Sequence, residues 1–164
     1  MNIPTIIRFA WNYFWDAQRY LFKEGKWKAE PIHLSLIDAV LNHLQEHQKS
    51  VVREQLENRY FLSWEPDGRI NVFFFYDESS LPLLSVPEFE DRLIKVELFV
   101  EGRKHVAHVI FYKGRIHSIE LKKPRSFFKG KSFRVGSVTE GKPSDSYTGA
   151  IDRLEHGKET ETNP

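Results

Sequence analysis

Two histidines fall on neighbouring segments of the chain, and neutral histidine is a common ligand for metal ions. His108 and His117 become diagonal neighbours if the strands that carry them pair through a turn at Lys113-Gly114. Two imidazoles do not complete a tetrahedral site, and the third ligand would have to be Glu97. We therefore interpret both histidines as half-exposed strand residues and expect neither a metal nor another cofactor.

The tripeptide Glu120-Leu121-Lys122 places a carboxylate and an ammonium group on the same side of a strand end. It resembles the Glu-x-Lys half of the PD-(D/E)xK nuclease signature, in which the carboxylate holds a metal ion and the lysine orients the attacking water. That resemblance implies a metal-dependent nuclease. The family's preceding acidic residue should lie on the adjacent strand, yet residues 106–112 contain no carboxylate. We interpret the pair as a strand-end charge pair and assign no catalytic residue.

Basic residues gather after residue 121 among phenylalanines and glycines, a mixture that binds nucleic acid when cations follow phosphates and rings stack on bases. The tripeptide Gly130-Lys131-Ser132 is not a phosphate-binding loop, because Arg125 stands where the first glycine belongs. The formal net charge of +1 weakens the case for nucleic acid, which we keep as the alternative function. The candidate residues are Lys122, Lys123, Arg125, Lys129, Lys131 and Arg134.

Alternation of apolar and polar residues predicts the strands that must position these groups. They cover residues 60–64, 70–76, 93–100, 106–112 and 115–121, with 133–138 as a sixth strand at an edge. A three-residue turn, Pro66-Asp67-Gly68 with Gly68 left-handed, would place Ile70, Val72 and Phe74 on the buried face. The later turns add to that face Ile94, Val96, Leu98, Val100, Ala107, Val109, Phe111 and Ile116.

Two helical patterns precede the strands. Residues 5–22 carry an apolar arc wider than one packing surface needs, with Trp11 and Trp15 on its flank. Residues 33–56 form a longer pattern with a bend or break in residues 45–50, which lack an apolar member. We expect an α+β fold, with both N-terminal helices packed on one face of a five- to six-stranded, mainly antiparallel sheet.

Length and composition indicate one domain, which we place at residues 1–138, followed by a polar and flexible tail at 139–164. Cysteine is absent, so disulfides and thiolate chemistry are excluded. We find neither a secretory signal nor a membrane span, and we expect a protein of the bacterial cytoplasm. In size and shape the predicted fold is similar to small stand-alone bacterial proteins of the toxin-immunity or adaptor kind, although no motif supports this.

The second face of the sheet would then mix aromatic, charged and histidine side chains, and an uncovered patch of that kind needs a partner. One alternative is that the C-terminal segment covers it through Phe127, Phe128 and Phe133; another is a homodimer. The leading hypothesis is a non-enzymatic protein-interaction module. Its candidate partner-binding residues are Trp11, Trp15, Phe73, Phe75, Phe99, His108, Tyr112, Arg115 and His117.

Overall fold

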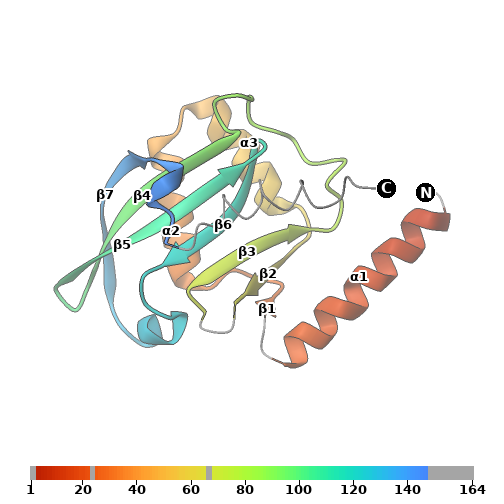
Figure 1. Ribbon diagram of the computed structural model, residues 1–164, viewed down its shortest axis with the longest axis horizontal. Helices are drawn as coiled ribbons and strands as arrows, with labels where there is room; N and C mark the ends of the chain where they lie inside the picture. The colour runs from red at the N-terminus through yellow and green to blue at the C-terminus, as the bar shows by residue number, and fades with distance from the viewer. Residues whose placement is uncertain (1–2, 23–24, 66–67, 148–164) are drawn as a thin grey trace, which may run out of the picture.

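Helices and one antiparallel sheet build the α+β fold seen in the computed structural model, which describes residues 3–22, 25–65 and 68–147, with residues 3–9 as backbone only (Figure 1). The helices are α1 (Ile3–Leu21), α2 (Pro31–His43) and α3 (Glu46–Glu57). The strands are β1 (Gly25–Lys26), β2 (Tyr60–Trp64), β3 (Ile70–Phe75), β4 (Asp91–Val100), β5 (Arg103–Tyr112), β6 (Arg115–Leu121) and β7 (Phe133–Gly141). Two short 3₁₀ helices, η1 (Arg125–Phe128) and η2 (Pro143–Asp145), flank β7. The described residues thus form three α-helices and seven strands, where two and five or six are predicted.

The sheet has the order β1-β2-β3-β6-β5-β4-β7, and neighbouring strands are antiparallel. Tight turns join β4, β5 and β6. Both central residues of each turn have positive φ, Glu101 and Gly102 in the first and Lys113 and Gly114 in the second, as the twist of a two-residue hairpin requires.

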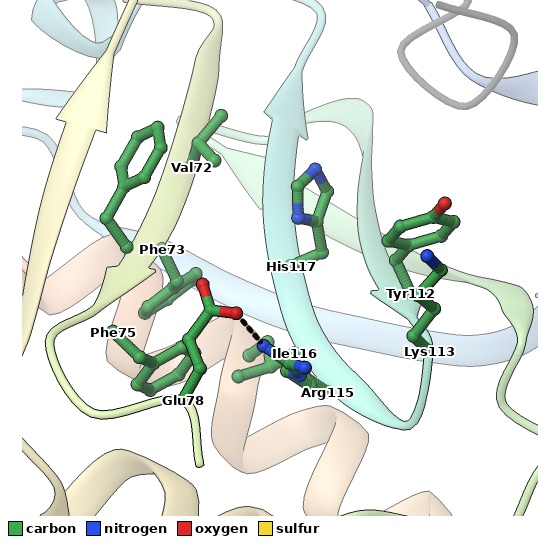
Figure 2. Close-up of a pocket in the computed structure, with 10 residues that line it drawn as sticks. Val72, Phe73, Phe75, Glu78, Tyr112, Lys113, Arg115, Ile116 and His117 are labelled. Carbon is green, nitrogen blue, oxygen red and sulfur yellow. Dashed lines mark hydrogen bonds and ion pairs between the residues drawn. The ribbon is translucent and has the colours of Figure 1, made fainter. Parts of the chain in front are cut away.

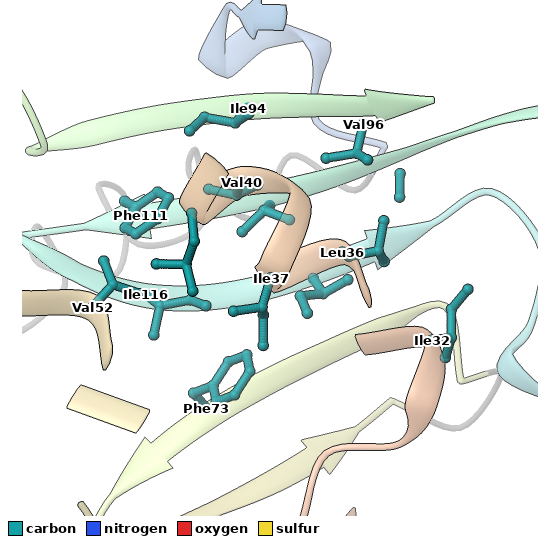
Figure 3. Packing of buried hydrophobic residues seen from close by; sticks show 14 of the residues in the cluster. Ile32, Leu36, Ile37, Val40, Val52, Phe73, Ile94, Val96, Phe111 and Ile116 are labelled. Atoms are coloured by element: carbon teal, nitrogen blue, oxygen red, sulfur yellow. The ribbon is translucent and has the colours of Figure 1, made fainter. Parts of the chain in front are cut away.

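Helices α2 and α3 cover one face of the sheet, and the main core lies between them and the strands (Figure 3). Leu36, Ile37 and Val40 of α2 are buried there. The core residues predicted on β4, β5 and β6 are all buried on this face, so that part of the register is confirmed. They are Ile94, Val96, Leu98, Val100, Ala107, Val109, Phe111 and Ile116.

The predicted register of β3 is wrong by one residue. Gly68 has the expected left-handed backbone, whereas Pro66 and Asp67 lie outside the described residues. Trp64 pairs with Asn71, so Phe73 and Phe75 face the core rather than the second face. The buried Asn71 is tolerated there because its amide donates to the Ile119 carbonyl oxygen at 3.2 Å.

The break predicted within the second helical pattern is confirmed. α2 ends at His43 and α3 begins at Glu46, where Gln45 forms a capping box with Gln48. The first helix departs from the prediction: α1 lies beyond the β1 edge of the sheet, away from α2 and α3 (Figure 1). Within the described residues we find no helix with the length and hydropathy needed to cross a membrane.

The chain after β6 returns to the sheet. Phe128 is buried in the main core and Phe127 and Phe133 pack against it, so these rings do not cover the second face as one alternative proposed. β7 continues to Gly141, past residue 138, and Ser146 and Tyr147 then lie against the second face through Glu120. The rest of the tail, residues 148–164, lies outside the described residues.

Candidate partner-binding groove

A gap opens within the sheet because β3 and β6 pair over only three residues. Ile70, Asn71 and Val72 pair with β6, and the register records no further pairs as the two strands diverge. The second half of β3 and the first half of β6 form opposite walls of the opening (Figure 2). A feature of this kind gives a ligand access to side chains that a continuous sheet would bury.

Gln55 of α3 satisfies the backbone groups next to the gap. Its side-chain oxygen accepts from the Ile116 N–H at 3.0 Å, and its amide donates to the carbonyl oxygens of Pro82 and Gly114 at 2.8 and 2.9 Å. Gln55 is fully buried, and these three bonds leave neither end of its amide unpaired. The side chain therefore ties α3 to the start of β6 and to the loop between β3 and β4.

The gap holds a cavity of about 290 Å³ that brings together five of the predicted partner-binding residues. They are Phe73, Phe75, Tyr112, Arg115 and His117. The rings of Phe73 and Phe75 stack with centroids 6.3 Å apart. Both side chains are nearly buried, at 4% and 9% exposed, and they reach the cavity only because the strands diverge. The larger open surface predicted for Phe73 and Phe75 is absent at their positions, because both rings face the core.

Charged groups line the mouth of this cavity. The Arg115 guanidinium donates to the Glu78 carboxylate at 2.6 Å across the opening (Figure 2). The Nε–H of Arg115 is buried and has no acceptor among the described residues. Burial, reinforced by the nearby Arg115 charge, lowers the pKa of His117, so its imidazole is neutral at pH 7. The cavity thus places a guanidinium–carboxylate pair and a neutral imidazole beside aromatic walls.

A second cavity of about 240 Å³ adjoins the first on the side of α1, and both are lined by Phe74, Phe75 and Glu78. Trp15, Asp16 and Arg19 of α1 form its other wall. We call the two cavities together the β3 groove. It runs from β6 to α1 and mixes aromatic with charged side chains.

α1 is attached to the sheet through a small polar and aromatic contact. Tyr76 donates its hydroxyl hydrogen to Asp16 at 2.5 Å and accepts from the Trp27 indole N–H at 2.9 Å. Tyr13 and Tyr20 pack on the Trp27 ring, with centroid distances of 5.6 and 5.0 Å. Burial raises the pKa of Asp16. Among the described side chains of α1, the polar residue Asp16 is therefore the buried one.

The opposite side of α1 carries three mutually contacting rings, Trp11, Phe14 and Trp15, which we call the aromatic face. Their ring centroids lie 5.9 to 6.3 Å apart. They remain 61%, 53% and 48% exposed, respectively. Trp15 belongs to the aromatic face and also lines the β3 groove, so the two surfaces are continuous.

His108 lies outside the groove, under the C-terminal segment. Its ring stacks on Tyr147 with centroids 4.1 Å apart, and its Nδ1 is 3.4 Å from the Glu120 carboxylate. Glu120 is fully buried and accepts from the Ser146 hydroxyl at 2.7 Å and the Tyr147 N–H at 2.8 Å. His108 and His117 therefore do not share a site, and the described residues contain no group of three potential metal-binding side chains.

This environment also bears on the nuclease resemblance. Glu120 is engaged by three groups, whereas Lys122 is exposed beyond the strand end. The residue opposite Glu120 on the adjacent strand is His108, not the acidic residue of the signature. The geometry gives the nuclease interpretation no support.

The remaining predicted residues lie near the β4–β5 turn and η1. Phe99 is partly buried beneath the Arg134 guanidinium, which is 4.6 Å from its ring centroid. Arg125 lies 3.7 Å above the Trp64 ring and forms an ion pair with Glu30. Lys131 contacts the Phe127 ring at 3.8 Å and Glu101 at 3.3 Å. Lys122, Lys123 and Lys129 are exposed.

Sequence reasoning missed several residues that line the groove, among them Phe74, Glu78 and, on α1, Asp16 and Arg19. Phe74 was placed in the core by the wrong register, although the run Phe73-Phe74-Phe75 puts aromatic rings on both faces and does not distinguish them. Glu78 lies in the loop after β3, and no spacing in the sequence relates it to Arg115. Comparison of the chain with protein families, curated proteins and solved structures finds no significant match.

Proposed function

We propose that this protein is a non-enzymatic interaction module that binds a segment of a partner protein across the β3 groove and the aromatic face of α1. The observation that carries the proposal is the exposure of Trp11, Phe14 and Trp15 beside a groove lined with charged groups. Tryptophan and arginine anchors surrounded by polar groups are typical of protein–protein binding sites.

The chemistry of the groove favours a polypeptide as the occupant. Asp16, Arg19, Glu78 and Arg115 line it together with aromatic rings, so a bound segment would meet hydrogen-bonding groups as well as apolar surface. Peptide groups of a partner can hydrogen-bond to the charged side chains that line the groove, whereas lipid chains cannot. Acidic and basic side chains both line the groove, so it provides little attraction to an anionic membrane.

Selection from a random peptide library on the immobilised full chain tests this proposal. We expect binding peptides with aromatic or aliphatic anchors. The double variant Trp11→Ala/Trp15→Ala should weaken them at least about 30-fold, since the loss of a single anchor costs on the order of 2 kcal/mol. The matched control is Leu83→Ala/Val86→Ala, which removes comparably exposed apolar side chains elsewhere and should leave affinity unchanged.

Two further measurements test whether a second copy of the chain or a lipid membrane covers the aromatic face instead. Light scattering would show a concentration-dependent dimer, lost in Trp11→Ala/Trp15→Ala, if a second copy of the chain covers the aromatic face. Cosedimentation with phosphatidylcholine–phosphatidylserine vesicles would show that the face binds lipid. Either result, without peptides that depend on Trp11 and Trp15, would refute the proposal.

A further inference from the structure

Positive charge is concentrated in one stretch of this nearly neutral chain. Residues 101–134 contain ten Lys and Arg and two Asp and Glu, a formal charge of +8, so the remainder carries −7 to give the total of +1. The fold brings several of these cations together where β5 begins, β6 ends and η1 follows. The low net charge of the chain therefore hides a strongly basic region.

His105 lies at the centre of this region. It is partly buried, its ring is 5.3 Å from Phe127, and its Nε2 is buried with no hydrogen-bond partner among the described residues. Desolvation lowers the pKa of His105, and four neighbouring cations lower it further. They are Lys123, Lys131, Arg103 and Lys122. The cations come from three separate segments and converge on one imidazole.

Several of these cations have no carboxylate partner. Lys131 and Lys104 are paired with Glu101 and Glu97, respectively. Within the described part of the chain, Arg103, Lys122, Lys123 and Lys129 are exposed and form no ion pair. Like charges that converge without counter-charges repel one another, and an anionic ligand would relieve that repulsion.

We propose that the basic cluster around His105, formed by Arg103, Lys122, Lys123 and Lys131, binds a chain of phosphate groups. Cations from three segments can contact successive phosphates, and the partly exposed Phe127 ring provides an aromatic surface beside them. Single-stranded nucleic acid and inorganic polyphosphate share this chemistry. The site is separate from the β3 groove: α1 lies beyond β1, and the β4–β5 turn lies on the opposite side of the view in Figure 1.

Fluorescence anisotropy on the full chain tests the site, with mixed-sequence 12-nucleotide RNA and DNA as probes and polyphosphate of similar length as competitor. With three or four phosphate contacts, affinity for RNA should fall about 20- to 50-fold between 50 and 200 mM salt. Competition by polyphosphate would identify phosphate chains in general as the ligand. Binding of RNA and DNA without such competition would identify nucleic acid.

Charge reversal locates the site. Lys122→Glu/Lys123→Glu should weaken RNA binding at least tenfold, whereas Lys28→Glu/Arg53→Glu, which changes the net charge equally at exposed positions elsewhere, should weaken it less than threefold. In the unchanged protein, NMR should show His105 titrating at higher pH when RNA is bound, since phosphates offset the surrounding cations. Equal losses in the two double variants, an unmoved His105 titration, or no binding of any probe at 50 mM salt would overturn the proposal.

Discussion

The two N-terminal helical segments show opposite relations between apolar character and burial. α1 has the wider apolar arc in sequence, yet Trp11, Phe14 and Trp15 remain about half exposed or more. α2 is shorter, and its Leu36 and Ile37 are buried in the main core. Amphipathicity indicates that a helix has an apolar face, but it does not identify the surface that will cover it. The apolar surface of α1 that the sheet leaves open is available to a partner.

The largest expected effect is a difference in stability loss between truncations in α2 and in α1. Leu36→Ala should lower the free energy of unfolding by about 3 kcal/mol, because it leaves a cavity under α2. Leu21→Ala in α1 should change it by less than about 0.5 kcal/mol, because Leu21 is 76% exposed. Urea denaturation followed by circular dichroism measures both. Equal losses would show that α1 contributes to the core as much as α2.

A second prediction concerns pH and the start of α2. Burial lowers the pKa of His33 from 6.5 to about 4, and its Nδ1 accepts from the Glu30 N–H at 3.2 Å. As pH falls, His33 is therefore protonated at a higher pH in the unfolded chain than in the folded chain. The free energy of unfolding should decrease as pH drops from 6.5 towards 4. This group alone should cost about 2 kcal/mol at pH 5. Denaturation at pH 7 and pH 5 measures the loss.

The control for this pH effect is His33→Gln, which retains an acceptor for the Glu30 N–H but does not titrate. Its stability should vary much less over the same pH interval. An undiminished pH dependence in the variant would assign the effect to other groups.

The smallest effect should appear at the attachment of α1. Tyr76→Phe removes the hydroxyl that bonds to Asp16 and Trp27. It should lower the free energy of local opening of α1 by about 1 kcal/mol. Amide exchange of residues 10–21 should accelerate about fivefold while that of α2 is unchanged. Tyr20→Phe is the control, since that hydroxyl has no partner among the described residues and its ring still packs on Trp27. Equal acceleration in both variants would contradict the proposed role of the hydroxyl.

The sheet from β4 to β6 could be predicted from sequence because two tight turns fix its register independently. Lys113-Gly114 and the preceding turn each bring apolar residues to the same face, and a slip of one residue would expose all of them. β3 lacked such a constraint. Its aromatic residues suit either face, and Asn71, whose polar side chain favours an exposed position, is buried because it finds a backbone acceptor on β6.

Most of the candidate site could not be predicted from the sequence, for a related reason. The aromatic character of α1 was visible in Trp11 and Trp15, but its position beside β1 depends on the contact of Asp16 with Tyr76, sixty residues away. The pairing of Arg115 with Glu78 likewise depends on where the loop after β3 runs. Patterns of period 2 and 3.6 report which side of an element is apolar, and they contain no information on such distant polar contacts.

The buried amide of Gln55 has a consequence for how the groove can evolve and be altered. Main-chain groups exposed at a strand divergence would ordinarily bind water or attract a foreign strand, and either would close the opening. Because the Gln55 amide already pairs with the Ile116 N–H and with the Pro82 and Gly114 carbonyl oxygens, it holds those backbone groups in place. Residues at the rim can therefore be exchanged to suit a different ligand without disturbing the scaffold beneath them.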